Sequence, residues 1–174
     1  MTEIDIGFQE CSEHMYSLMK EIIKKENMFY LEDAKILIIL DTKKRISRKK
    51  IVLGRIMKTN DMLRFLSIEP NDLLSGYDYM MLLDMAATMV AGPEYLEKLV
   101  RHELRHCTYD DTSENPWGLR AHDIEDFYDE VELNKDDPLW AQILAVKVHG
   151  HYVQNAKKKN PQRSLFEDNS AGNT

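Results

Sequence analysis

The stretch PEYLEKLVRHELRHC, residues 93–107, decides how this chain is organised. Its apolar residues Leu96, Leu99 and Val100 recur at steps of three and one, so that they form a single stripe on a helix. The preceding Gly92-Pro93 pair is a start signal, since proline suits the first turn of a helix, where its missing N–H costs nothing. The sequence therefore predicts a helix over residues 93–107, packed against a core along one face.

His-Glu-Leu-Arg-His occupies residues 102–106 of this predicted helix. Helical residues four apart share a face, so His102 and His106 can hold one metal ion together. Glu103 lies about 100° further around the helix, where it can reach a metal-bound water without being a ligand. Zinc lowers the pKa of such a water toward 7, and a glutamate can take its proton and later protonate the leaving amine. The motif predicts a zinc hydrolase.

A catalytic zinc site needs a third protein ligand and an open fourth position. His122 is the first histidine after the motif, sixteen residues beyond His106, and we predict that it is the third ligand. Three nearby carboxylates are alternatives, of which Glu125 is the main one because glutamate is a common third ligand in zinc peptidases; the others are Asp123 and Asp126.

Peptide hydrolysis also requires a group that stabilises the developing oxyanion. Tyr109, Arg120 and Tyr128 lie near enough to the motif in sequence to be candidates. The sequence does not choose among them.

The rest of the chain predicts an α+β protein with a single domain over residues 1–154 and a polar tail over residues 155–174. Apolar periodicity and turn residues predict helices over residues 3–28, 122–134 and 138–154, strands over 35–41, 51–58, 62–67 and 77–84, and loops over 69–76 and 108–119.

Composition narrows the class of protein. The 174 residues are 43% hydrophobic and carry a net charge of -7, which is typical of a globular protein and makes nucleic acid an unlikely direct ligand. Two cysteines exclude a disulfide framework. The N-terminus lacks a signal-peptide pattern, and the longest apolar run, residues 80–92, is too short to span a bilayer. We expect a cytoplasmic protein without membrane contact.

The segments YDYMMLLD, EYLEKLVRHELRHC and HDIEDF, together with a basic hairpin and Gly54, resemble the putative phage metallopeptidases of the SprT-like zincin group. The similarity covers roughly residues 10–135, and its specific parts are the RHELRH and HDIEDF segments. It implies zinc on His102, His106 and His122, with Glu103 as the base. It also implies a zincin-like α+β fold, in which a small, mostly antiparallel sheet of three or four strands packs against the N-terminal and zinc helices. A phage origin and action in a bacterial cytoplasm follow from the same likeness.

Residues 43–50, KKRISRKK, contain six basic residues in eight and are predicted to form a hairpin loop. A solvated turn is one interpretation of this run, and a patch for phosphate or an acidic substrate is the other. No aromatic residue lies among the charges, so stacking on single-stranded bases is not indicated.

The tail contains Gln162-Arg163-Ser164-Leu165-Phe166, which is similar to the pentapeptide that binds the bacterial sliding clamp. Such a segment can insert Leu165 and Phe166 into an apolar groove, with Gln162 forming hydrogen bonds at its edge. Equally, the two apolar residues can pack back onto the domain.

Three functions are therefore compatible with the sequence, of which the last is a DNA- or RNA-directed role through the basic run 43–50, with an affinity that falls steeply with salt. The first is a zinc metallopeptidase acting on a protein or peptide through Glu103. The second is a non-enzymatic phage accessory protein with structural zinc, which binds a host protein such as the sliding clamp. A fourth protein ligand, for example Asp126, would favour the second function.

Overall fold

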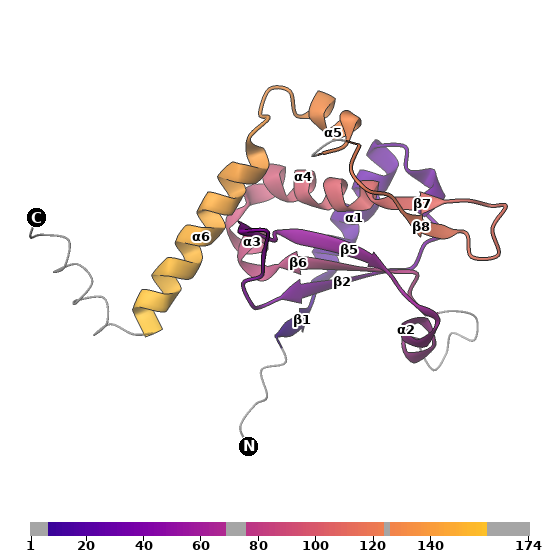
Figure 1. Ribbon diagram of the computed structural model, residues 1–174, viewed down its shortest axis with the longest axis horizontal. Coiled ribbons are helices and arrows are strands. Elements are labelled where there is room, and N and C mark those ends of the chain that lie inside the picture. The colour runs from indigo at the N-terminus through magenta and orange to yellow at the C-terminus, as the bar shows by residue number, and fades with distance from the viewer. Residues whose placement is uncertain (1–6, 69–75, 124–125, 160–174) are drawn as a thin grey trace, which may run out of the picture.

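The computed structural model describes residues 7–68, 76–123 and 126–159, in which helices pack around a small sheet (Figure 1). The helices are α1 (Glu13–Lys25), α2 (Asp61–Leu66), α3 (Met85–Val90), α4 (Gly92–Arg105), α5 (Tyr128–Leu133) and α6 (Trp140–Lys159). The strands are β1 (Phe8–Glu10), β2 (Ile36–Asp41), β3 (Ile46–Ser47), β4 (Lys50–Ile51), β5 (Gly54–Lys58), β6 (Tyr79–Asp84), β7 (Cys107–Tyr109) and β8 (Trp117–Leu119).

Four strands form the main sheet, in the order β1-β2-β6-β5. The two central strands have the sequences ILIILD and YMMLLD and run parallel, with Ile36 opposite Tyr79 and Asp41 opposite Asp84. Each of these two strands is paired with another strand on both sides, and nearly continuous apolar sequences are typical of such central parallel strands. Strands β1 and β5 pair antiparallel at the two edges, so the sheet is mixed and two of its three pairings have the expected antiparallel direction.

One face of the sheet carries the main core. Side chains of α1 and α4 pack there against every second residue of the central strands, including Ile38, Met81 and Leu83. Helices α3 and α6 pack against each other at one end of the sheet, and the hairpin β7–β8 extends from the other end of α4 (Figure 1). This arrangement places the C-terminal end of α4, with the H-E-x-x-H motif, above edge strand β5.

Two predicted elements have a different structure. Residues 62–67, predicted as a strand, lie mostly in helix α2, because Asn60 caps the helix by accepting a 2.8 Å hydrogen bond from the Leu63 N–H. The predicted loop 108–119 contains most of the β7–β8 hairpin, in which Thr108 pairs with Gly118. Neither contact shows in the apolar periodicity of its segment, since one is a side-chain cap and the other is backbone pairing between strands.

Several boundaries also differ. The N-terminal helix begins at Glu13 rather than near residue 3, since residues 8–10 pair with β2. The helix predicted from residue 122 begins only at Tyr128, whose N–H donates to the Asp123 carboxylate. Helix α3, which the sequence does not predict, follows β6 directly, and α6 continues to Lys159, five residues past the predicted helix end at residue 154. Among the described helices, none combines the length and apolar character needed to cross a bilayer.

Tyr79 ties the β7–β8 hairpin to the sheet, and its loss should be measurable. Its fully buried hydroxyl lies 2.8 Å from the Gly118 carbonyl and 3.0 Å from that of Thr108, and it accepts from the Gly118 N–H at 3.2 Å. We expect Tyr79→Phe to lower the free energy of unfolding by about 1–3 kcal/mol in urea titrations, because these buried groups lose their partner. Tyr30→Phe is the control, since its hydroxyl makes one bond, to Cys107, on a half-exposed ring. An equal loss for both variants would contradict this role of Tyr79.

Candidate metal centre

Three histidine side chains converge at the C-terminal end of α4. His102 lies in the last turn of the helix, His106 is its C-cap residue, and His122 comes from the segment between β8 and α5. The Nε2 atom of His122 lies 3.1 Å from the Nε2 atoms of both His102 and His106. Within the described part of the chain, these three residues are the one group of potential ligand atoms close enough to share a metal ion.

Two of these rings have a partner near Nδ1, the outer ring nitrogen that does not face the other histidines. Nδ1 of His106 lies 2.9 Å from the Arg120 carbonyl oxygen, which can only accept, so this nitrogen carries the proton. Nδ1 of His102 lies 3.0 Å from Oδ1 of Asp126, although the N–H direction is not aligned well enough for a straight hydrogen bond. Both Nε2 atoms then present lone pairs to the same point. Their spacing fits a cation, because tetrahedral zinc with Zn–N bonds of 2.0–2.1 Å separates its nitrogens by roughly 3.4 Å.

The electrostatics of the cluster favour neutral ligands at two positions. Burial lowers the pKa of His106 and of His122, and the neighbouring His102 lowers both further. Burial acts on His102 in the same direction, but Asp126 and Glu103 outweigh it, and its pKa is raised. A metal ligand must be deprotonated at its donor atom, so His106 and His122 are suited to the role even at mildly acidic pH.

Phe127 forms the apolar wall of the cluster. Its ring is fully buried and lies 4.8–5.5 Å, centroid to centroid, from all three imidazoles. The guanidinium of Arg120 lies 4.6 Å from the centre of the Phe127 ring. The same ring therefore restricts the rotation of every candidate ligand, which an apolar shell around a metal site is expected to do.

The side chain of Glu103 lies against edge strand β5. Its side chain is 4% exposed and accepts a hydrogen bond from the backbone N–H of Ile56. Gly54 makes room for it, since a Cβ atom at that position would lie 2.9 Å from Oε1 of Glu103. Burial raises the pKa of Glu103 to about 7, in spite of the nearby His102 and the Ile56 N–H. A carboxyl group with this pKa can both accept and donate a proton near neutral pH.

Comparison with known proteins now bears on this geometry. The family model described as "Putative phage metallopeptidase" matches residues 8–148, well over half of the chain. The chain belongs to this family. Comparisons with curated proteins and with solved structures gave no significant match. The metallopeptidase family and the three-histidine cluster together indicate a metal ion, whereas zinc, the SprT-like grouping and a zincin-like fold stay predictions.

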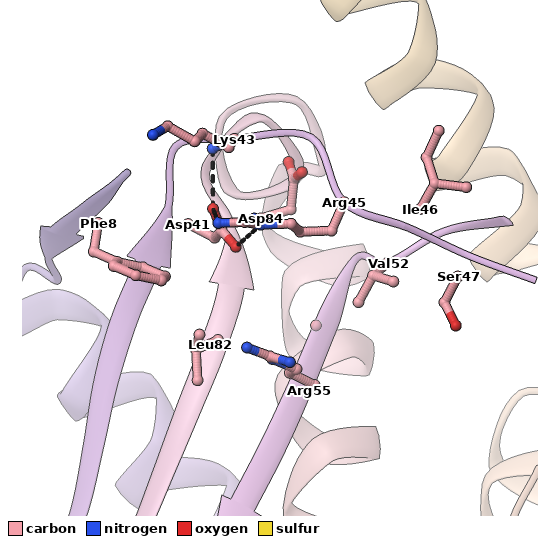
Figure 2. A pocket seen from close by; sticks show the side chains of 11 residues that line it. Phe8, Asp41, Lys43, Arg45, Ile46, Ser47, Val52, Arg55, Leu82 and Asp84 are labelled. Carbon is pink, nitrogen blue, oxygen red and sulfur yellow. Dashed lines mark hydrogen bonds and ion pairs between the residues drawn. The ribbon is translucent and has the colours of Figure 1, made fainter. Parts of the chain in front are cut away.

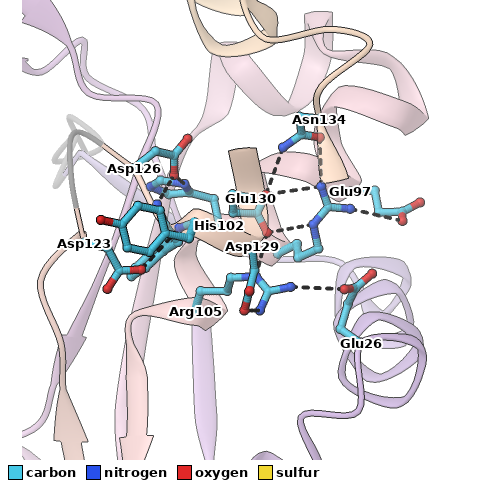
Figure 3. Close-up of polar contacts among 12 residues, drawn as sticks. Glu26, Glu97, His102, Arg105, Asp123, Asp126, Asp129, Glu130 and Asn134 are labelled. Carbon is cyan, nitrogen blue, oxygen red and sulfur yellow. Dashed lines mark hydrogen bonds and ion pairs between the residues drawn. The ribbon is translucent and has the colours of Figure 1, made fainter. Parts of the chain in front are cut away.

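A buried ionic network joins α4, the helix that carries the H-E-x-x-H motif, to α5 (Figure 3). Glu130 on α5 is fully buried and accepts hydrogen bonds of 2.8 Å from Nε of both Arg101 and Arg105. Asn134, one turn later on α5, bonds to both Arg101 and Glu130. Sequence reasoning missed this network. Its signal was the spacing, because Arg101 and Arg105 each precede a motif histidine and Glu130 and Asn134 are also four residues apart.

The carboxylates considered as alternative ligands have other positions. Asp126 contacts the Nδ1 atom of His102 and is not among the described residues that could share a metal ion with the three histidines. Asp123 accepts the N–H of Tyr128 at the start of α5. Glu125 lies outside the described residues. The structure thus gives no support among the described residues to a fourth protein ligand.

The three candidates for oxyanion stabilisation differ in how free their side chains are to contact a substrate. Arg120 is committed to structure, since its Nε donates to the Arg105 carbonyl at 2.8 Å and its guanidinium stacks on Phe127. Tyr109 packs on Trp117 in the β7–β8 hairpin. Tyr128, 64% exposed, begins α5 only a few residues from His122, and of the three it has the most freedom to contact a substrate.

The basic run forms the predicted hairpin, which directly precedes β5. Ile46 pairs with Ile51, and Arg48 and Lys49 form its tight turn with positive φ angles. Arg45 is paired with the buried Asp41, and together with Phe8 and Arg55 they line a pocket on the sheet face opposite α4 (Figure 2). At least one of the six basic residues in the run, Arg45, is therefore engaged in an ion pair within the domain. The tail residues Gln162, Leu165 and Phe166 lie outside the described residues, and clamp binding stays a prediction.

Removal of the buried carboxylate should destabilise the fold. We expect Glu130→Gln to lower the free energy of unfolding by about 3 kcal/mol, because Arg101 and Arg105 are left without their shared buried counter-charge. Urea unfolding of metal-free protein measures the change. Glu132→Gln is the matched control, since that residue makes an exposed pair with Lys135 on the same helix and should cost less than about 0.5 kcal/mol. Similar losses for the two variants would refute the role of Glu130.

Loss of the outer partner of His102 should weaken metal binding without unfolding the chain. We expect Asp126→Asn to lower metal affinity by about 10–100-fold, the usual effect of removing the carboxylate behind a ligating histidine. Competition with a chromophoric chelator measures this affinity. Asp129→Asn is the control, because that exposed carboxylate contacts Arg105 and no histidine. An unchanged affinity in Asp126→Asn would show that this carboxylate does not tune the site.

Proposed function

We propose that the protein is a zinc-dependent metallopeptidase that hydrolyses a peptide bond, with Glu103 as the proton-transferring residue. The observation that carries this proposal is the convergence of three histidine Nε2 atoms beside a buried glutamate from the same helix turn. Membership of the metallopeptidase family supports it independently. Protein or peptide substrates follow from the family.

The donor set fits zinc. Three imidazole nitrogens are the ligand set of a catalytic zinc site with one open position, and two of the rings have a partner at their other nitrogen, Asp126 beside His102 and the Arg120 carbonyl beside His106. Bound there, zinc would act as a Lewis acid, making water acidic near neutral pH and polarising the substrate carbonyl.

Glu103 performs the proton transfers in this proposal. Its carboxylate oxygen accepts a proton from the attacking water, and the same oxygen then donates this proton to the nitrogen of the leaving amine. The raised pKa suits both steps, since the group is neither too weak a base nor too weak an acid near pH 7. The Ile56 N–H holds the carboxylate on the β5 side of the motif by a hydrogen bond. The carboxylate fits there because Gly54 has no side chain.

Edge strand β5 supports an extended substrate. It pairs with β6 on one side only, and alternate residues of an antiparallel edge strand direct their N–H and C=O groups outward. Gly54 and Ile56 belong to this outward set, because the hydrogen-bonded pairs along this edge of β6 include Thr59 with Asp78 and Leu53 with Asp84. Of their outward groups, the Ile56 N–H already donates to Glu103 and is not available to a peptide. A peptide that adds to this edge would pass beside the base and the three histidines.

The direct test compares two variants with the wild type. Glu103→Gln should retain about one zinc per chain but lose cleavage of a labelled unfolded protein by at least 10²–10⁴-fold, because the side chain keeps its shape and loses its basicity. His122→Ala should lose both zinc and cleavage, since one of three ligands is gone. Elemental mass spectrometry measures the zinc, and gel-based or fluorescence assays measure the cleavage.

Two results would reject the proposal. Equal cleavage by Glu103→Gln and wild type would show that the activity does not use this base. A folded wild-type chain that takes up no zinc when it is supplied would remove the metal from the mechanism altogether.

A further inference from the structure

The main sheet has an outer face, the one that points away from α4, and this face is apolar. The strand register places Leu37 beside Met80 and Ile39 beside Leu82 on it, with Arg55 opposite Leu82. Successive residues of a strand point to opposite faces, so these side chains alternate with the core residues of β2 and β6. Among the described residues, the main core includes none of the four apolar members of this row. An apolar sheet face normally packs against a second layer, so the outer face is suited to a docking segment.

A pocket of about 590 Å³ opens on the outer face, where the parallel strands β2 and β6 end (Figure 2). Phe8, Val52 and Leu82 form its apolar part, together with Ile46 of the hairpin. This volume is within the range of pockets that enclose small ligands, and apolar walls around a few charged groups are typical of such pockets. The pocket therefore has room for apolar side chains that enter from solvent.

The charge that remains unmatched at this pocket is positive. One of its two acidic residues, Asp41, pairs with Arg45. The other, Asp84, accepts a 2.9 Å hydrogen bond from the Tyr152 hydroxyl. Arg55 also lines the pocket and is exposed, and within the described part of the chain its guanidinium forms no ion pair or hydrogen bond. Because Arg55 lies opposite an apolar residue of β6, a ligand that contacts both needs an apolar part beside a negative charge.

The polar tail that follows α6 has this composition. It contains Leu165-Phe166, its two large apolar residues, immediately followed by Glu167-Asp168. We propose that Leu165 and Phe166 dock in the pocket on the outer face, with Glu167 and Asp168 beside the guanidinium of Arg55. The apolar pair then leaves water, and the acidic pair supplies the missing counter-charge.

The tail is long enough to reach this pocket. Tyr152 of α6 lies beside it, since its hydroxyl bonds to Asp84, and α6 ends at Lys159, seven residues later. At 1.5 Å per residue, this end lies roughly 10 Å further along the helix. An extended chain from Lys159 to Leu165 spans up to roughly 20 Å, which covers the return. A segment tethered this closely has an effective concentration in the millimolar range, so the chain's own tail is favoured over the tail of a second copy.

Docking would also hide the tail from other partners. The pentapeptide that is similar to the clamp-binding sequence uses the same two side chains, Leu165 and Phe166. A partner that binds them must first displace them from the pocket, so its apparent affinity is reduced by the fraction of chains in which the tail is undocked.

Protease protection tests the docking. Chymotrypsin should cut the full chain after Phe166 at least about tenfold more slowly than it cuts a synthetic peptide of residues 160–174, because only the undocked tail enters the protease. Arg55→Glu should lower this protection by at least about fivefold, since like charges then face each other. Lys58→Glu is the matched control, because it makes the same change on the same strand but lies opposite Tyr79 on the core face, and it should alter the protection by less than about twofold. Mass spectrometry follows the fragments, and circular dichroism checks that the variants are folded.

A charge swap tests the contact directly. The double substitution Glu167→Arg, Asp168→Arg should lose the protection and regain it when combined with Arg55→Glu, each rate being divided by that of a peptide of the same sequence. Equal cutting of the full chain and the peptide would overturn the proposal, as would protection that Arg55→Glu leaves unchanged or a swap that restores nothing. Protection that disappears on dilution from about 100 to about 1 μM would overturn docking within one chain, because the tail of a second copy would then occupy the pocket.

Discussion

The buried carboxylate of Glu130 holds the helix that carries the H-E-x-x-H motif to the segment that carries the third histidine. It is shared by Arg101 and Arg105 on one side and by Asn134 on the other, with no exposure to solvent. Charges buried in this way lose much of their hydration. They are stable only in an arrangement that gives each of them a hydrogen-bonding partner of opposite charge or polarity. The position of α5 against α4 is therefore specified, and with it the short segment that contains His122, Asp126 and Phe127.

Consecutive residues of one helix turn serve three different purposes. Arg101 points to the ionic network, His102 to the metal cluster and Glu103 to the edge of the sheet. Successive helical residues are 100° apart, so each side chain reaches a different neighbour of α4. The candidate ligand, the candidate base and the anchor are thus positioned by a single rigid element, and the precision of the site depends on how α4 is held from each side.

The sequence predicted those parts of the fold whose signal is local. The apolar runs 35–41 and 77–84 and the periodic segment 93–107 correspond to β2, β6 and α4. Asn60 and Asp123 show where such reasoning failed, since one side chain turns an apolar run into helix α2 and the other delays α5 until Tyr128. The β7–β8 hairpin was missed because its attachment to the sheet, through the hydroxyl of Tyr79, joins residues far apart in the chain.

By itself, the sequence determined the motif, with two histidines on one helical face and a glutamate beside them, and the family likeness that the match over residues 8–148 confirms. Only the tertiary structure decided that His122 brings its Nε2 atom to those of the two motif histidines, and that Asp126 instead contacts the Nδ1 atom of His102. It alone revealed the buried network around Glu130. The reason is physical, because helical spacing fixes neighbours within a turn, whereas burial and the pairing of distant charges depend on how separate elements pack.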